Sequence, residues 1–433
     1  MAPPSSILWQ NKTKTVVLMD VPRSIEEAQV LSSELKEAHD TGTRVTCRLR
    51  RLISSPPPQS PFPTPEPKTS GSGPPTAPAA AQVAELMTRA AVESALDEIA
   101  TSYSGPWCLP RVTAPVPAWP SPTEVDATDH DVNDSTPADP LTPSYSQEKS
   151  QHHHSSDNLL LPPLSHPLQA SILPSRELFL ASTNPGQFHL ILLDPPWPNR
   201  SARRKHRHRH DRASAGPSNT NSSAAARGSY RPAGDLPALR SLLSAIPIAS
   251  RLAPGGLVAV WLTNSPRCAE LLTGGTGSSS ASSGGLFAEW GVEPVGEWIW
   301  VKVTARGEPV VSVESCWRRP WERLIIARRK GLDPSGAGAV KGKVIVSVPD
   351  VHSRKPNLKR LFEEEGLLPE RYEALEVFAR NLTAGWWAWG DEVLKFQWRD
   401  WWMDANDDDG VREDDGGDAA AVAAAAAEER ATG

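Results

Sequence analysis

The chain has 433 residues, of which 43 are proline and 29 are glycine, and its formal net charge is −6. This proline content excludes packed core throughout, so we expect one folded domain of ordinary size. The negative charge excludes a wholly basic nucleic-acid binder, and any surface for nucleic acid has to be local. Four widely separated cysteines lack the spacing of zinc or redox pairs and predict free thiols in a reducing compartment.

Residues 1–53 predict a small amino-terminal module. Residues 15–20 have the composition of a short strand, and Ser24 followed by Glu27 forms a capping box that predicts a helix reaching about His39. The sequence shows no signal peptide and no run of about eighteen apolar residues. We therefore expect a soluble protein that makes no membrane contact and resides in the nucleus, with the cytoplasm left open.

Residues 54–158 are rich in proline, serine and acidic residues and predict a largely disordered linker. Residues 82–100 interrupt this linker with apolar side chains at helical spacing, which predicts a helix. Three consecutive histidines, residues 152–154, resemble a metal site only superficially, because consecutive residues do not converge on one ion. We therefore predict no metal.

Residues 159–402 alternate apolar runs with helical stretches, which is the pattern of a three-layer α/β sheet. Low-complexity insertions at residues 203–228 and 274–285 fall in predicted loops, where insertion costs little. The acidic and alanine-rich residues 403–433 are typical of a solvated, disordered tail. The predicted strands are residues 188–193, 256–263, 297–303, 323–328, 343–348 and 376–378, and the predicted helices are residues 236–250, 357–365 and 392–399.

The most informative stretch is the apolar run 190–193, which stops at Asp194, Pro195, Pro196 and an exposed Trp197. Such a run is typical of a strand buried on both faces of a parallel sheet, where ligands gather at the carboxyl ends of the strands. The carboxylate of Asp194 and the carbonyl of Pro195 can accept the two hydrogens of an exocyclic amino group, while the indole of Trp197 covers the ring. The structural alternative is a strand-end turn with a packed aromatic side chain.

A second group lies near the end of the predicted strand 376–378. Glu376, Arg380 and Asn381 stand close in sequence to Gly385 and Gly390, which suits a ribose and a carboxylate approached closely by backbone. A solvated glutamate–arginine pair is the alternative interpretation.

A dense basic run begins shortly after Trp197 and includes Arg203, Arg204 and Lys205. Such a loop attracts phosphates in a salt-dependent way, although a nuclear-import signal or an inert insertion has the same composition. Tyr230 is a candidate wall of the base pocket. Asn264 ends a predicted strand and can hydrogen-bond either to substrate or to a loop.

Four motifs in residues 172–398 resemble the eukaryotic adenine-amino methyltransferases related to the mRNA adenosine methyltransferase, in particular their methyltransferase-like-four branch. The resemblance implies a Rossmann-like, S-adenosylmethionine-dependent methyltransferase. Its substrate would be the exocyclic amino group of adenine in small nuclear RNA, messenger RNA or DNA. Methyl transfer would be direct, with neither metal nor covalent intermediate. The motifs are DPPWPNRS at residues 194–201, PGGLVAVWLTN at residues 254–264, HSRKP at residues 352–356, and the long motif LEVFARNL-TA-GWWAWGDEVLKFQ at residues 375–397.

The resemblance also implies individual roles. It assigns Glu376, Arg380 and Asn381 to the ribose and methionine parts of S-adenosylmethionine and Lys355 to its carboxylate. Asp194, Pro195, Pro196 and Trp197 form the catalytic tetrad, and Asn199 joins the substrate-binding residues.

Two cofactor positions depart from the family pattern. Asp391 stands where relatives usually carry asparagine, so the expected ribose or adenine contact has lost its donor. A strand near Ser182 should lay its backbone against the adenine edge, but Thr183 replaces an expected aspartate. Glu392 agrees with the favoured branch and completes the cofactor set.

The competing hypothesis is a non-catalytic methyltransferase-like subunit that binds RNA or acts as a scaffold for a partner. The intact tetrad together with Lys355, Glu376 and Arg380 favours the enzyme. A nucleic-acid partner is expected, a protein partner is left open, and no base-reading motif separates RNA from DNA.

Overall fold

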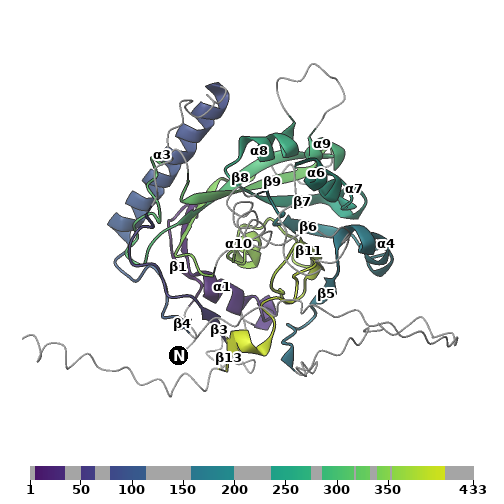
Figure 1. Ribbon diagram of the computed structural model, residues 1–433, viewed down its shortest axis with the longest axis horizontal. Coiled ribbons are helices and arrows are strands. Elements are labelled where there is room, and N and C mark those ends of the chain that lie inside the picture. Colours follow the sequence, from purple (N-terminus) through teal and green to yellow (C-terminus); the bar gives the residue numbers. More distant parts are fainter. Residues whose placement is uncertain are drawn as a thin grey trace, which may run out of the picture.

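The computed structural model describes residues 5–34, 50–63, 79–113, 158–198, 236–274, 285–315, 318–331, 339–351 and 354–404. A curved sheet of ten strands forms its centre, in the order β1-β2-β10-β8-β9-β7-β6-β11-β12-β5 (Figure 1). Helices cover both faces of this sheet, so the predicted three-layer α/β architecture is confirmed. A second, small sheet has the order β13-β3-β4.

The described elements have the following bounds. The strands are β1 (Ile7–Gln10), β2 (Val16–Met19), β3 (Arg51–Ser54), β4 (Val112–Thr113), β5 (His166–Gln169), β6 (Phe188–Leu193), β7 (Leu252–Leu262), β8 (Val292–Lys302), β9 (Trp321–Arg329), β10 (Lys343–Ser347), β11 (Ala374–Val377), β12 (Trp387–Gly390) and β13 (Trp402–Met403). The helices are α1 (Val21–Glu27), α3 (Ala79–Ser102), α4 (Ile172–Ser182), α6 (Leu236–Ser244), α7 (Ile248–Arg251), α8 (Pro266–Thr273), α9 (Leu286–Glu289), α10 (Lys359–Glu364) and the 3-10 helix η2 (Arg399–Trp401).

The strand directions determine where a ligand site can lie. Strands β7, β6, β11, β12 and β5 pair in parallel, whereas β9 runs antiparallel between β7 and β8. The carboxyl ends of the parallel strands therefore meet at one edge, together with the amino end of β9. Ligands of open α/β sheets bind at this edge.

The amino-terminal residues belong to the same sheet, because β2 pairs in parallel with β10. The capping-box prediction for this region is wrong. Helix α1 begins at Val21, since the side chain of Asp20 accepts a hydrogen bond from the backbone N–H of Arg23. The hydroxyl of Ser24 instead donates to the carbonyl of Val21.

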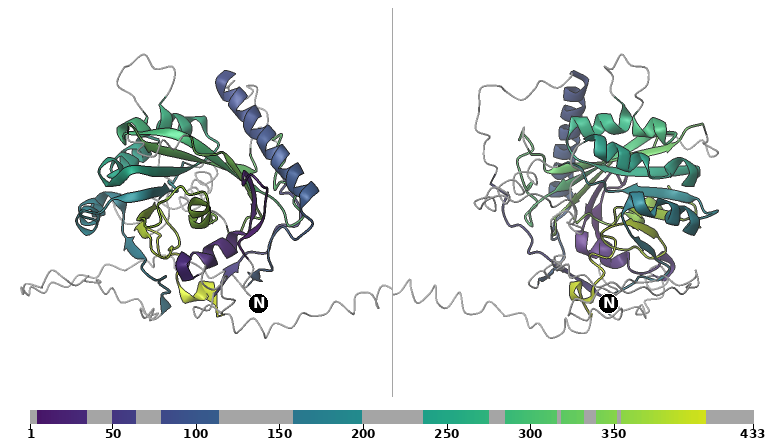
Figure 2. Two further views of the ribbon diagram at one scale, coloured as in Figure 1. Left: turned by 180° about the vertical axis from the view of Figure 1, so that it is seen from behind. Right: turned by 45° about the vertical axis from the view of Figure 1, so that its right-hand side comes forward.

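The two faces of the sheet bury separate cores. Helices α1 and α10 cover one face around the core of Leu192, Trp261 and Trp298. Helices α4, α6, α8 and α9 cover the other face. Helix α3, predicted within a linker, packs on this second side next to β2, β8 and β10 (Figure 2).

Three predicted elements differ from the structure. Residues 180–182 end helix α4 and form no strand, since Ile172, Ser175 and Phe179 lie on its buried face at helical spacing. The predicted helix 236–250 is divided into α6 and α7 by Pro247, which lacks a backbone donor. In the predicted helix 392–399, residues 392–396 form successive turns and Trp398 forms a β-bridge with Leu159, so no α-helix is present there.

The described residues include no helix that is long and apolar enough to cross a membrane.

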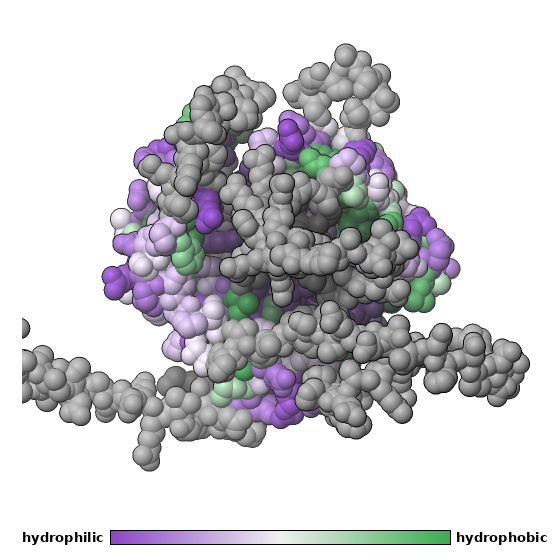
Figure 3. Space-filling view, in the orientation of Figure 1, coloured by the Kyte–Doolittle hydropathy of each residue, from purple (hydrophilic) through white to green (hydrophobic). Residues whose placement is uncertain are grey.

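The coloured part of the face in Figure 3 is largely hydrophilic, with small hydrophobic areas between the hydrophilic ones.

Candidate active site

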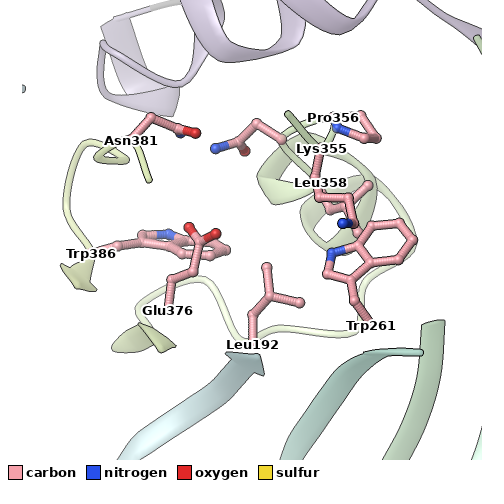
Figure 4. Close-up of a pocket in the computed structure, with 9 residues that line it drawn as sticks. Leu192, Trp261, Lys355, Pro356, Leu358, Glu376, Asn381 and Trp386 are labelled. Atoms are coloured by element: carbon pink, nitrogen blue, oxygen red, sulfur yellow. The ribbon is translucent and has the colours of Figure 1, made fainter. Parts of the chain in front are cut away.

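Strand β6 delivers Asp194 to the carboxyl edge of the sheet, where its backbone N–H donates to the carbonyl of Val377 at 3.3 Å. A small cavity opens at the same edge. Figure 4 shows Glu376 pointing into it, with Lys355 and Trp261 on the side opposite Trp386. The lining residues are Leu192, Trp261, Lys355, Pro356, Asn357, Leu358, Glu376, Asn381 and Trp386.

Lys355 links Asp194 to this cavity. Its Nζ lies 3.2 Å from both carboxylate oxygens of Asp194 and 3.2 Å from Oε2 of Glu322. Burial alone would lower the pKa of Lys355, but the charges of Asp194 and Glu322 outweigh it and raise the pKa. Asp194 and Glu322 thus share one ammonium group at the site.

Glu322 was not predicted from the sequence as a site residue. Burial opposes its ionisation, but Lys302 and Lys355 hold the pKa of its carboxyl down at about 2. Glu322 lies near the amino end of β9, and this end reaches the active edge because β9 runs antiparallel to its neighbours. A charged residue at the start of the run 323–328 was the available signal, but only the strand direction shows where it points.

Glu376 lies on β11 opposite Leu192 of β6. Burial, reinforced by the nearby charge of Asp194, raises the pKa of Glu376 to about 8, although Arg380 acts in the opposite direction. Arg380 forms an ion pair with Glu392 at 3.2 Å, and Asn381 lines the cavity. The structure therefore brings Glu376, Arg380, Asn381 and Glu392 to the edge predicted for them.

Trp197 differs from its prediction, because its side chain is buried and only 6% of its surface is exposed. Its indole N–H donates to the carbonyl of Trp261 at 2.7 Å, and its backbone N–H donates to the carbonyl of Pro195 at 2.8 Å. A buried indole needs a partner for its N–H, and this partner lies in β7. Trp197 thus anchors the Asp-Pro-Pro turn to β7.

Three further predicted site residues, Asn264, Asp391 and Ser182, contact the scaffold or lie at its surface. The amide of Asn264 donates to the carbonyl of Trp321 at 2.6 Å and so joins β7 to β9. Asp391 is exposed and accepts a hydrogen bond from the hydroxyl of Ser171. Ser182 is exposed at the carboxyl end of α4, next to the amino end of β6, which is opposite to the predicted adenine edge.

The two glycines of the long motif serve the backbone. Gly385 has a φ of +77°, which favours glycine, and a Cβ on Gly390 would lie 3.1 Å from the Cα of Phe378. Their lack of side chains therefore accommodates the turn and the neighbouring chain, and the predicted close approach of a ligand to this backbone stays a prediction.

Several predicted substrate residues lie outside the described residues and stay predictions: Asn199, Arg203, Arg204, Lys205 and Tyr230. Within the described ranges, no group of three or more histidine, cysteine, aspartate or glutamate side chains is arranged to hold a metal ion.

Comparison with known proteins identifies relatives over nearly the whole chain. The N6-methyladenosine RNA methyltransferase MTA1 of Cryphonectria parasitica is 45% identical over 400 residues, which are 92% of this chain and 95% of that protein. Its namesake in Pyricularia oryzae is 43% identical over 418 residues, or 93% and 97% of the two chains. Human N(6)-adenine-specific methyltransferase METTL4 is 34% identical over 219 residues, or 48% of this chain and 38% of its own length.

The matched region contains the site. A family model described as MT-A70 matches residues 188–392, which begin with β6 and end just beyond Asp391. Asp194, Lys355 and Glu376 all lie within this match. The chain therefore belongs to the MT-A70 family of methyltransferases.

Proposed function

We propose that this enzyme, an adenine N6-methyltransferase of nucleic acid, acts on RNA with S-adenosylmethionine as methyl donor. The relatives that match nearly the whole chain are named RNA methyltransferases. The protein of Caenorhabditis elegans named DNA N6-methyl methyltransferase is 28% identical over 48% of this chain. The extent of the match thus supports RNA.

The chemistry of the cavity fits S-adenosylmethionine. Glu376 and Asn381 can bind ribose hydroxyls, and Lys355 offers a cation to the carboxylate of the methionine part. The raised pKa of Glu376 is that of a half-buried carboxyl with too few polar partners, and hydroxyl donors would supply them. When bound, S-adenosylmethionine supplies the methyl group.

The Asp-Pro-Pro turn can orient the acceptor. The amino nitrogen of adenine is a weak nucleophile because its lone pair is delocalised into the ring, so the enzyme has to hold it in line with the methyl group. Asp194 accepts one amino hydrogen, and the carbonyl of Pro195, which keeps a second lone pair beside the bond from Trp197, accepts the other. Both hydrogen bonds favour a pyramidal nitrogen.

The position of Asp194 carries this proposal: a carboxylate at the end of β6, held by Lys355 beside the cavity that Glu376 lines. The test compares single-stranded RNA and DNA oligonucleotides of one adenine-containing sequence. Both are incubated with labelled S-adenosylmethionine, and the digested nucleosides are analysed by mass spectrometry.

We expect N6-methyladenosine from RNA at a rate at least about tenfold above that of N6-methyldeoxyadenosine from DNA, because a 2′-hydroxyl contact discriminates the two. Faster methylation of DNA would refute the RNA assignment. Methylation at a ring nitrogen of adenine, instead of at the exocyclic amino group, would refute the role of the Asp-Pro-Pro turn.

A further inference from the structure

A buried ion cluster lies outside the cavity and consists of Arg111, Asp350 and Arg354. Their side chains are 2%, 0% and 0% exposed. Nη1 of Arg354 forms an ion pair with Oδ2 of Asp350, and Nη1 of Arg111 lies 3.9 Å from Oδ1 of the same carboxylate. Arg354 directly precedes Lys355 in the sequence, so this cluster holds the chain next to the active-site lysine.

Arg111 binds the backbone of the same loop. Its Nη1 donates to the carbonyl of Pro349 at 2.9 Å and to that of Ser55 at 3.0 Å, and its Nη2 donates to Val348 at 2.9 Å. Val348 and Pro349 directly follow β10 and begin the segment that leads to Lys355. The side chain of Arg111 thus holds the two consecutive carbonyls of Val348 and Pro349, directly after β10.

Further contacts hold the segment from other directions. The carboxylate of Asp350 accepts a hydrogen bond from the backbone N–H of Ser55 at 2.8 Å. The guanidinium of Arg354 donates to the carbonyl of Ile53 at 3.1 Å and lies 4.3 Å from the ring centroid of Phe396. The loop is therefore held by β3, by the segment around Arg111 and by the carboxyl-terminal aromatic residues.

The members of this cluster differ in what their loss would leave behind. Two buried guanidiniums share one carboxylate, so removing Asp350 would leave two uncompensated charges away from water. Removing Arg111 instead leaves the carbonyls of Ser55, Val348 and Pro349 without their donor. Lysine cannot replace Arg111 fully, because its ammonium is a point charge without the planar fork that reaches three carbonyls. A displacement of about 1 Å at a reacting group can cost about a hundredfold in rate.

We propose that Arg111 is a positioning residue for the methyl-transfer reaction and acts by fixing residues 348–351 and, through Asp350, Arg354, which directly precedes Lys355 between Asp194 and Glu322. This inference rests on the proposed function only for the role of Lys355. It assigns a function in the reaction to an amino-terminal segment that lies outside the MT-A70 match at residues 188–392.

The test is a double-mutant cycle in the full-length chain with Arg111→Gln, Lys355→Met and the double variant. Each protein is assayed for kcat, for the KM of the RNA and for S-adenosylmethionine affinity by calorimetry, well below its melting temperature. Arg329→Gln is the matched control, because Arg329 also donates to two carbonyls, those of Leu252 and Ala249, but at the amino-end edge of the sheet.

We expect Arg111→Gln to lower kcat and cofactor affinity by about ten- to a hundredfold, with little change in the KM of the RNA. In the Lys355→Met background, the same change should lower them by less than about twofold, since residues that act as one unit are not additive. Arg329→Gln should keep the wild-type kcat.

The proposal would be overturned if Arg111→Gln lowered kcat and cofactor affinity by the same factor in the wild-type and Lys355→Met backgrounds. It would also be overturned if Arg111→Gln lowered the melting temperature but left kcat unchanged. If Arg111→Gln does not fold, Arg111→Lys replaces it in the cycle, with the same pattern expected at smaller amplitude. If the wild-type chain transfers no methyl group, the proposed function fails. The cycle in cofactor affinity then still decides the role of Arg111.

Discussion

Three carboxyl groups crowd the active edge, and the structure separates the pKa values of two of them, Glu322 and Glu376. Glu322 is held ionised by Lys302 and Lys355, with a pKa of about 2, whereas Glu376 has its pKa raised to about 8. Asp194 shares the ammonium of Lys355 with Glu322. Neighbouring acids with separated pKa values are typical of sites that assign different tasks to similar groups.

The raised pKa of Glu376 makes stability depend on pH. Its folded-state pKa of about 8 exceeds the ordinary value of 4.5, so between these values the folded chain holds a proton that the unfolded chain releases. The stability that this group contributes is complete below about pH 4.5 and is lost as the pH rises to about 8.

We expect the free energy of unfolding of the wild type to fall relative to Glu376→Gln by up to about 1.4 kcal/mol per pH unit in this window. Urea denaturation of both proteins between these pH values measures the difference. If the two stability curves run parallel, Glu376 titrates normally and the burial argument is wrong.

At individual positions, the sequence predicts chemistry better than orientation. Asp194 was predictable because it is an acid directly after an apolar run, and Lys355 and Glu376 were predictable because they stand in specific motifs. The burial of Trp197 was not, because an indole that covers a ligand and one that supports a turn have the same local sequence. Glu322 was missed because its position depends on the antiparallel direction of β9.

At the level of elements, helix α3 is part of the folded domain. Its carboxyl-terminal half buries Val92, Ala95 and Ile99 against the sheet, whereas Val83, Leu86 and Met87 in the amino-terminal half are exposed. Apolar spacing predicted the helix, but the proline-rich segments around it gave no sign that it packs. A helix flanked by such segments still docks when it buries apolar side chains against a sheet.

Two substitutions in α3 test this docking. Ile99 is fully buried, so Ile99→Ala should lower the free energy of unfolding by about 2–5 kcal/mol through lost burial and a cavity. Leu86→Ala is the matched control in the same helix, since Leu86 is 62% exposed and should change stability by less than about 0.5 kcal/mol. Denaturant unfolding measures both, and equal effects would show that α3 is not docked.

Apolar runs predicted several strands closely, but two short parallel strands were missed. The run 188–193 coincides with β6, and the runs at 343–348 and 376–378 lie within one or two residues of β10 and β11. Strands β5 and β12 were missed because four residues carry little periodicity. Helix α4 was taken for a strand at its end because a family expectation outweighed the helical spacing of its apolar residues.

At the scale of the whole molecule, segments far apart in sequence build one fold. Strand β2 extends the sheet beyond β10, and β13, near the end of the described chain, pairs with β3. Patterns within single segments predict neither pairing, because each depends on a partner hundreds of residues away. The matches to the two MTA1 proteins cover more than nine-tenths of this chain, whereas the match to human METTL4 covers about half.

The whole account depends on Asp194, and one assay tests it most directly. Transfer of labelled methyl from saturating S-adenosylmethionine to an adenine-containing RNA oligonucleotide is measured for the wild type, Asp194→Ala and a control, Glu293→Ala, whose side chain is exposed on β8. Calorimetry with S-adenosylmethionine confirms that each protein still binds the cofactor.

We expect Asp194→Ala to lose about a hundred- to ten-thousandfold in rate, because the acceptor that orients the amino group is gone, while the control keeps the wild-type rate. Formation of N6-methyladenosine by Asp194→Ala at close to the wild-type rate would contradict the central claim that this carboxylate orients the amino group for methyl transfer.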